Sequence, residues 1–240
     1  MLHIDDLVEL LSCNDPDDWS TKLIEIAKNF GFEQVLFGMV PHKTVPLETA
    51  FLRSNYAASW RQTYDEQKMH YVDPTVAHCL NSSLPIVWQP SIFKSQQENE
   101  FYEQARSYWL RSGICIPIHG ATGEFGVMSF VSSEADHLAI AGDAQSLGKL
   151  TLMRDYAQES AIQFLAKADV GLDDVHLTKR EYELLKWLAL GKTAWEISKI
   201  LICSESNVNF HVKNIKRKLR VGSRQQAVVK AIKQGLIYPA

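Results

Sequence analysis

The sequence predicts an α+β protein in two parts: an N-terminal α/β/α sandwich with a mainly antiparallel sheet, and a small all-α domain after it. Two observations lead to this prediction. Helix and strand patterns alternate as far as residue 165, whereas only helix patterns follow. Between the two regions, the segment AKADVGLDDVHL at 166–177 is rich in small and acidic residues and contains a glycine. We therefore expect domains at 1–168 and 178–240, joined by a linker at 169–177.

The N-terminal region mixes amphipathic helix patterns with short apolar strand patterns. In chain order these are helices at 2–11 and 19–30, strands at 34–40 and 49–54, a helix at 56–67, a strand at 85–88 and a helix at 99–111. The stretch 114–132 has two apolar runs around a glycine-rich turn, which predicts a β-hairpin, and 136–165 is largely helical. Strands joined partly by hairpins, with helices on both sides, indicate the sandwich.

The C-terminal region carries regularly placed helix caps. Thr178 and Glu181 have the spacing of a capping box, as do Thr193 and Glu196, and Gly191 fits a helix stop between them. With further N-caps expected at Ser204 and Ser223, the predicted helices run at about 179–190, 194–201, 205–219 and 224–234. The short connection between the second and third helices predicts a helix-turn-helix, whose second helix enters the major groove of DNA.

Apolar spacing predicts which faces of these helices are buried. The residues expected in the core are Ile197, Ile200 and Leu201 from the second helix, and Val208, Val212, Ile215 and Leu219 from the third. Ser206, Asn209 and Lys213 then share a different face of the third helix. Because Asn pairs with adenine and Lys with guanine, we expect base contacts from this face. Phosphate contacts are expected from Lys216, Arg217 and Lys218, and more weakly from Lys192.

Charge is divided unevenly along the chain. The whole chain has a formal net charge of -3, but 177–240 holds 13 Lys and Arg against 4 Asp and Glu, a formal +9. The remainder has 12 against 24, a formal -12. A basic module on an acidic protein favours a polyanionic partner such as double-stranded DNA, although basic runs alone are usually only a solvated helix face.

No pattern for catalysis, a metal or a cofactor is present. The eight histidines and four cysteines form no zinc-site spacing, and no P-loop or GxSxG motif occurs, so we expect no enzyme. The separated cysteines indicate reduced thiols. No apolar run approaches the roughly 18 residues of a membrane span. The N-terminus also lacks the features of a signal peptide, so a cytoplasmic location without membrane contact is expected.

One aromatic and acidic cluster has the composition of a small-molecule site. Tyr56, Trp60 and Tyr64 recur at i, i+4 and i+8, so they lie close to one helix face, and Asp73 follows. Aromatic residues with polar tips and one carboxylate could hold an amide- or ester-bearing ligand in an apolar cavity. Ordinary core packing, with Asp73 capping the helix after Pro74, is the alternative, and composition alone favours it.

The C-terminal sequence from Leu177 to Leu219 closely resembles the LuxR-type helix-turn-helix, including EIS at 196–198 and VNFH at 208–211. The segments NYAASWRQTY, VDPTVAHC, LPIVWQPSIF and GEFGVMSF resemble the acyl-homoserine-lactone-binding domain of quorum-sensing receptors. The resemblance implies that Trp60 donates to the lactone carbonyl and Asp73 accepts from the ligand amide N–H. Tyr56 and Ser129 would bind the amide carbonyl.

The same resemblance implies supporting roles around this head-group site. Tyr64 and Trp88 would wall the lactone, Thr75 would support Asp73, and Arg61 would reach a 3-oxo group. Apolar walls for the acyl tail would include Leu36, Val76, Phe125 and Val127, with Val40, Leu47, Ala50 and Leu52 as further candidates. Phe93, Cys115 and Leu47 depart from the receptor pattern, which leaves the acyl length open.

These observations predict a transcriptional regulator that binds an acyl-homoserine lactone, of 3-oxo type with a medium to long chain, as its signal in quorum sensing. It would form a homodimer, bind a two-fold-related promoter site and contact RNA polymerase. The alternatives are a regulator of the same family tuned to a non-lactone small molecule, and a lactone or amide hydrolase. The retention of Trp60 and Asp73 argues against the first, and the lack of a nucleophile–base pair argues against the second.

Overall fold

A computed structural model describes residues 4–131, 137–165, 177–233 and 236–237 of the 240-residue chain. The chain divides into two compact units, Met1–Ala168 and Asp169–Ala240. We call them the sensor unit and the helix-turn-helix unit and describe each by itself. The linker expected at 169–177 lies, except for Leu177, outside the described residues.

The sensor unit is built on a five-stranded sheet with the order β2-β1-β5-β4-β3, in which every neighbouring pair is antiparallel. Its strands are β1 (Gln34–Val40), β2 (Phe51–Ser54), β3 (Ile86–Val87), β4 (Gly113–His119) and β5 (Phe125–Val131). The predicted hairpin is present as β4 and β5, and Gly123 in its turn has a φ of +106°. In β5, a Cβ atom at Gly126 would lie 2.3 Å from the Gly38 carbonyl oxygen, so the close approach of β1 requires glycine there.

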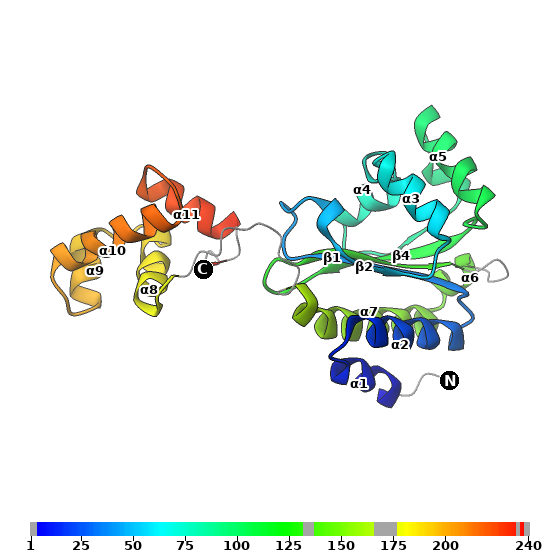
Figure 1. The fold of residues 1–240 in the computed structure, drawn as a ribbon, viewed down its shortest axis with the longest axis horizontal. Coiled ribbons are helices and arrows are strands. Elements are labelled where there is room, and N and C mark those ends of the chain that lie inside the picture. Colours follow the sequence, from blue (N-terminus) through cyan, green and yellow to red (C-terminus); the bar gives the residue numbers. More distant parts are fainter. Residues whose placement is uncertain (1–3, 132–136, 166–176, 234–235, 238–240) are drawn as a thin grey trace. The chain divides into compact units, whose positions relative to one another are not determined.

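Helices cover both faces of this sheet (Figure 1). One layer contains α2 (Pro16–Asn29) and α7 (Ala144–Leu165), with α1 (Ile4–Ser12) outside it, and the other contains α3 (Ala58–Glu66), α4 (Pro74–Asn81) and α5 (Gln96–Ser107). The short helix α6 (His137–Gly142) and the 3-10 turns η1 (Leu47–Thr49), η2 (Met69–Tyr71) and η3 (Pro90–Ile92) complete the unit. The predicted α/β/α sandwich with an antiparallel sheet is confirmed.

Several predicted boundaries were wrong for local reasons. The helix expected at 136–165 is divided at Asp143, whose carboxylate accepts the backbone N–H groups of Gln145 and Ser146 and so starts α7 anew. The strand expected at 49–54 begins as the 3-10 turn η1 and becomes extended only at Phe51. Trp88, expected in a strand, follows β3 and reaches the sheet through one backbone bond, from its N–H to the Gly113 carbonyl, 2.8 Å.

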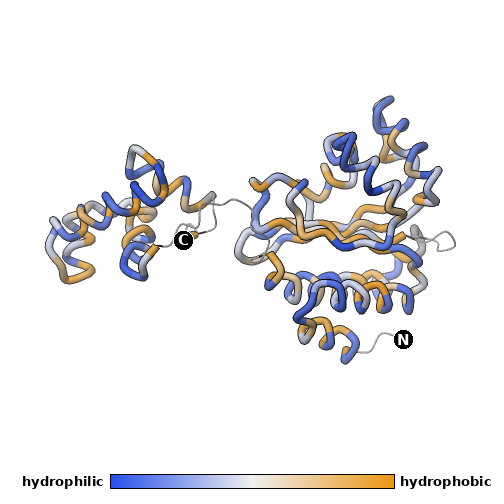
Figure 2. The backbone as a smooth tube through the Cα atoms, in the orientation of Figure 1, coloured by the Kyte–Doolittle hydropathy of each residue, from blue (hydrophilic) through white to orange (hydrophobic). Residues whose placement is uncertain are grey.

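Side-chain alternation gives the two sheet faces different tasks. Odd-numbered β1 residues and even-numbered β4 and β5 residues join a buried apolar cluster with α1, α2 and α7. From the sheet these are Val35, Phe37 and Met39, Ile114, Ile116 and Ile118, and Met128 and Phe130. Figure 2 shows the strands as mainly hydrophobic and the covering helices as mixed. The opposite face carries Leu36, Val127 and Ser129, which line the cavity described below.

The helix-turn-helix unit consists of α8 (Lys179–Ala189), α9 (Ala194–Ile200), α10 (Glu205–Lys218) and α11 (Arg224–Lys233). Both predicted capping boxes are formed, by Thr178 with Glu181 and by Thr193 with Glu196. Ser204 caps α10 by accepting from the Asn207 N–H, 3.2 Å. The predicted small all-α domain is therefore confirmed.

Among the described residues of this unit, ten form the buried core, and α10 supplies Val208 and Ile215, with Leu219 directly after it. Ile197 of α9 is also in this core, and Leu201 and Val212 pack against it partly buried. Ile200 was expected in the core, but 40% of it is exposed. The helix α9 has only seven residues, and its apolar side chains outnumber those that one short face can bury. In the described part of the chain, no helix combines the length and apolarity that a membrane crossing needs.

Candidate functional site

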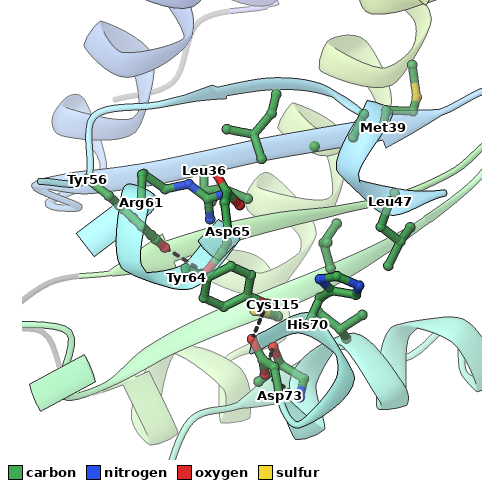
Figure 3. Close-up of a pocket in the computed structure, with 18 of the residues that line it drawn as sticks. Leu36, Met39, Leu47, Tyr56, Arg61, Tyr64, Asp65, His70, Asp73 and Cys115 are labelled. Atoms are coloured by element: carbon green, nitrogen blue, oxygen red, sulfur yellow. Dashed lines mark hydrogen bonds and ion pairs between the residues drawn. The ribbon is translucent and has the colours of Figure 1, made fainter. Parts of the chain in front are cut away.

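A cavity of about 390 Å³ lies in the sensor unit between the sheet and the layer of α3 and α4 (Figure 3). All twelve residues predicted to contact a ligand line this cavity: Leu36, Tyr56, Trp60, Arg61, Tyr64, Asp73, Thr75, Val76, Trp88, Phe125, Val127 and Ser129. The aromatic cluster of the sequence therefore lines a cavity, but the common helix face expected for it was wrong, because Tyr56 precedes α3, which begins at Ala58. The structure thus brings together residues that come from five separate stretches of the chain.

Asp73 is the buried anion of this cavity, with 5% of its surface exposed. It is also the N-cap of α4, because its Oδ1 accepts the Thr75 N–H at 2.8 Å and the Thr75 hydroxyl at 2.7 Å. Its Oδ2 accepts the Tyr64 hydroxyl at 3.1 Å. The capping role considered for Asp73 is therefore real, but it leaves the residue facing the cavity.

The carboxylate of Asp73 is held without a compensating cation. Burial raises the pKa of Asp73 above its usual range, and the hydrogen bonds from Thr75 and Tyr64 offset only part of this shift. Among the described residues, no Lys, Arg or His forms an ion pair with it. Each carboxylate oxygen has two lone pairs, so Oδ2 can accept one more donor from the cavity.

Tyr56 and Ser129 form a second polar position on the cavity wall. The Tyr56 hydroxyl donates to the Ser129 Oγ at 3.0 Å, and both side chains are buried. Burial raises the pKa of Tyr56, so its hydroxyl stays protonated and can donate. The Ser129 hydroxyl comes from β5 and Tyr56 from the segment after β2, so both can meet one ligand group.

Trp60 and Arg61 follow each other on α3 but have different partners. Trp60 packs on Tyr108, with ring centroids 5.3 Å apart, and in the described chain no hydrogen bond engages its indole N–H. The Arg61 guanidinium pairs with Asp65 at 2.6 Å and lies 4.9 Å from the Tyr64 ring. Trp60 thus offers a donor to the cavity, whereas Arg61 is already paired.

Cys115 is a cavity residue whose contacts the sequence did not reveal. The Trp88 indole donates to the Cys115 Sγ at 3.0 Å, so Trp88 has a polar partner in addition to its position in the cavity wall. Burial raises the pKa of the Cys115 thiol to about 11. The thiol therefore stays neutral and belongs to the polar row next to Ser129, its neighbour across the sheet.

The sheet gives the cavity floor a direction. Leu36, Ser129 and Cys115 are paired across one row, Gly38 and Val127 across the next, and Val40 and Phe125 across the third. At about 3.4 Å per residue, the floor runs roughly 14 Å from Ser129 to Phe125. Figure 3 shows Tyr56 and Arg61 on one side and Leu47 and Met39 on the other. The cavity is thus polar at one end and apolar along its length.

A contact between Glu48 Oε1 and His70 Nε2, at 3.5 Å, also lines the cavity and was missed from the sequence. It ties η1 to η2, two segments that follow different strands and helices. No periodic pattern marks either residue, because both lie in short turns where side-chain direction depends on the fold. Phe101 and Asp65 are further lining residues of this kind.

The predicted DNA-contacting residues lie on the helix-turn-helix unit, and most are accessible. Ser206, Asn209, Lys213 and Arg217 of α10 are exposed, and Lys216 is half-buried. Among the described residues, no group of His, Cys, Asp or Glu could hold a metal ion.

Lys218 and Lys192 differ from this exposed group. Lys218 pairs with the buried Glu181 at 2.6 Å, which ties the end of α10 to the start of α8. Burial raises the pKa of Glu181, but the Lys218 ammonium and Thr178 outweigh it, and the net pKa is lowered. Lys192 pairs with Glu196 at 3.3 Å. Lys218 is therefore part of the fold rather than of the exposed basic surface.

The cavity and the helix-turn-helix together define a class of protein, a regulator that senses a small molecule and binds DNA. Residues 15–161 match the family described as "Autoinducer binding domain", and residues 175–231 match "Bacterial regulatory proteins, luxR family". The chain belongs to the LuxR family of bacterial regulatory proteins with an autoinducer-binding domain. The expectation that it is not an enzyme agrees with this family.

Similar proteins cover nearly the whole chain. The transcriptional activator protein VanR of Vibrio anguillarum is 34% identical over 235 residues, 93% of this chain and 92% of VanR. LuxR of Aliivibrio fischeri is 33% identical over 233 residues, 95% of this chain and 92% of LuxR. Escherichia coli SdiA shares the fold, with a TM-score of 0.73 and 24% identity, over 97% of this chain and 96% of SdiA.

Proposed function

We propose that this protein is a quorum-sensing transcriptional activator whose signal is an N-acyl-homoserine lactone. One observation carries the proposal: a buried carboxylate without a cation, Asp73, faces a cavity that also holds the free indole donor of Trp60. An acyl-homoserine lactone has one amide N–H, carbonyl oxygens and an apolar chain. These groups match one acceptor, several donors and the apolar floor in number and in kind.

The ligand would lie along the cavity floor. Its amide N–H would donate to Asp73 Oδ2, and its lactone carbonyl would accept from the Trp60 indole. The Tyr56 hydroxyl, now bonded to Ser129, would turn to the amide carbonyl. Tyr64, Trp88 and Thr75 would hold these groups in place, and the acyl chain would run past Leu36, Val76, Val127 and Phe125.

A 3-oxo group would have to meet Arg61, which already pairs with Asp65. Arg61 has five N–H donors, so it could bind a ketone oxygen, directly or through water, without leaving Asp65. We therefore keep a 3-oxo chain of medium to long length as the proposed signal.

Ligand binding would act on DNA through folding and dimer formation. A ligand that binds only the folded sensor unit stabilises it. A homodimer would then present two α10 helices to a two-fold-related promoter site and contact RNA polymerase. In this proposal Ser206, Asn209 and Lys213 meet base edges, and Lys216, Arg217 and Lys192 meet phosphates. Lys218 is assigned to its bond with Glu181 instead.

A related regulator tuned to a non-lactone signal is the second candidate, because SdiA, which has the same fold, forms a complex with octanoyl-rac-glycerol. A glycerol head group has hydroxyl donors that Asp73 could also accept. The two candidates differ in their carbonyl groups: a lactone offers the Trp60 indole a ring carbonyl in addition to the acyl carbonyl, whereas a monoacylglycerol has only its one ester carbonyl.

The head-group assignment predicts that Asp73→Ala weakens lactone binding by about 1–3 kcal/mol, because the ligand amide is left buried without an acceptor. Trp60→Phe should also weaken lactone binding, while octanoylglycerol binding should change less. Calorimetric titration of the ligand-free protein with each ligand measures both effects. Glu103→Ala on α5, outside the cavity, is the control. Equal lactone affinity in all four proteins would rule out this site.

The DNA assignment predicts two different losses on α10. Asn209→Ala should cost about 1–3 kcal/mol on the cognate duplex and relax preference at one position of each half-site. Lys216→Ala should weaken binding to every duplex and make the salt slope shallower by about one unit. Titrations of cognate and scrambled duplexes at several salt concentrations, with lactone present, test both. An equal loss for Asn209→Ala on both duplexes would remove it from base reading.

A further inference from the structure

The exposed face of α10 carries a large apolar side chain that the proposed contacts do not use. Phe210 is 61% exposed, although the helix is otherwise polar on this side. Its nearest aromatic neighbour is His211, with ring centroids 5.5 Å apart and an edge-to-face arrangement. The ring is absent from the buried core of the unit, which takes Val208 and Ile215 from the same helix. Packing of the unit therefore does not account for Phe210.

Helical geometry places Phe210 at the centre of the exposed face. At 100° per residue, Val208 and Ile215 point to the core, and Phe210 points about 20–40° away from the direction opposite to them. Ser206 precedes it by four residues and Lys213 follows by three, so both lie beside it on this face. Each is exposed. Phe210 thus stands between two residues already proposed to reach base edges.

The position of Phe210 along α10 also suits a contact with base edges. The helix α10 runs from Glu205 to Lys218, so Phe210 lies in its N-terminal half, six residues after the Ser204 cap. In a helix-turn-helix that half meets the base edges, while the basic end lies nearer the phosphates. A phenyl ring offers no hydrogen bond, so it can read a base only through an apolar group. In the major groove that group is the C5-methyl of thymine.

We propose that Phe210 is a specificity residue that packs on the C5-methyl group of one thymine in each half-site. The inference rests on the proposed DNA-binding function and adds the base that this residue selects. Cytosine has no methyl group at this position, and purines present polar N7 and exocyclic atoms there, so a ring in contact would favour thymine over all three. Ser206 and Lys213 would fix the neighbouring positions and hold the ring in register.

The test removes only the methyl group. Full-length protein with bound 3-oxo-acyl-homoserine lactone first selects sites from a pool of random duplexes. Each thymine of the selected site is then replaced by deoxyuridine, symmetrically in both half-sites, and affinity is measured. Burying one methyl group corresponds to about fourfold in affinity per half-site. We expect one thymine pair whose replacement weakens wild-type binding by about fifteenfold, the product of two such factors.

Variants connect this effect to Phe210. Phe210→Ala should bind thymine and deoxyuridine duplexes equally, and Phe210→Leu, which stays apolar, should keep part of the difference. Val229→Ala, an exposed apolar change on α11, should keep all of it. If Phe210→Ala retains the full methyl effect, or wild type shows none, the inference is overturned while DNA binding stands. If wild type enriches no sequence at all, the proposed function fails and the inference with it.

Discussion

The two units each bury one carboxylate at the start of a helix, but they treat it in opposite ways. Asp73 caps α4 in the sensor unit, and Glu181 lies in the capping box of α8 in the helix-turn-helix unit. They are 5% and 2% exposed. Glu181 has the Lys218 ammonium at 2.6 Å, and its pKa is lowered. Asp73 has hydroxyl and amide donors, and its pKa is raised by burial.

Under the proposed function, this difference separates a structural carboxylate, Glu181, from a ligand-binding carboxylate, Asp73. A buried charge is costly unless it is paired and hydrogen-bonded. Glu181 meets that requirement within its own unit, so the helix-turn-helix is complete as it folds. Asp73 keeps an oxygen facing a cavity of about 390 Å³, and in the proposed function a ligand supplies the missing donor. The sensor unit should therefore depend on its ligand for stability, and the other unit should not.

The largest effect expected from this comparison is selective stabilisation by the ligand. At a lactone concentration one hundred times Kd, the free energy of unfolding of the sensor unit should rise by about 2.7 kcal/mol, because only the folded state binds. The helix-turn-helix unit should gain nothing directly. Hydrogen exchange read by mass spectrometry can follow β4 and β5 of one unit and α8 and α10 of the other in the same sample.

Asp73→Ala provides the control for this prediction, because it should need more lactone for the same protection of β4 and β5. Equal slowing of exchange in α8 and α10 would show that the two units unfold together. That outcome would contradict the claim that only the sensor unit depends on its ligand for stability.

The sequence predicted most of this contrast through local signals. The spacing of Thr178 and Glu181 predicted the capping box, and that of Trp60 and Tyr64 predicted their shared position on α3, because helical periodicity depends only on neighbours in the chain. Tyr56 was expected on the same helix face, but α3 begins at Ala58, and Tyr56 lines the cavity from the segment before the helix. The roles implied for Asp73 came from a family resemblance, since composition alone favoured a cap. The structure shows the cap and the cavity position in one residue.

Contacts between distant segments could not be predicted in this way. Lys218 lies 37 residues from Glu181, and Cys115 lies 27 residues from Trp88. Basic spacing on α10 made Lys218 resemble a phosphate contact, because a linear pattern cannot show which end of α8 packs on it. The division of helix 136–165 at Asp143 likewise depends on one side chain bonding its own backbone rather than on any change in hydropathy.

The two carboxylates should change the stability of their units with pH in opposite directions. The pKa of Asp73 is raised above its ordinary 3.8, so the folded state holds more protons in that window and stability falls as pH rises through it. The pKa of Glu181 is lowered below its ordinary 4.5, so its stabilisation is present above 4.5 and is lost as pH falls. Asp73→Asn should remove the contribution of Asp73 to the pH dependence of the unfolding free energy of the sensor unit. Glu181→Gln should remove the contribution of Glu181 in the helix-turn-helix unit.

The unfolding free energy of each variant should be compared with that of wild type at the same pH. Other carboxylates also contribute to the pH dependence, because Glu98 and Asp143 of the sensor unit have lowered pKa values. Urea unfolding of the ligand-free chain from pH 3.5 to 7, read by pulse hydrogen exchange in each unit, gives both differences. Glu183→Gln, which alters an exposed pair with Arg180 on α8, is the control and should matter little. Parallel pH trends for Asp73→Asn and Glu181→Gln would contradict the opposite treatment of the two carboxylates.

The smallest expected effect concerns a strained backbone position in the helix-turn-helix unit, the unit that the buried Glu181–Lys218 pair stabilises. Ile202 follows the C-cap of α9 with a φ of +49°, and 93% of it is exposed. A β-branched residue is costly in this left-handed conformation, which glycine adopts freely. Ile202→Gly should raise the unfolding free energy of this unit by about 1 kcal/mol, since the relief of about 1–2 kcal/mol is partly offset by the greater freedom of glycine in the unfolded chain.

Lys68→Gly is the sensor counterpart: Lys68 also has a positive φ, +51°, after the C-cap of α3, but it is not β-branched, so its gain should be smaller. Urea midpoints of each unit, with wild type alongside, measure both changes. A loss of stability in Ile202→Gly would mean that this exposed side chain contributes packing to the unit, and the helix-turn-helix would then no longer owe its stability to the buried core and the Glu181–Lys218 pair alone.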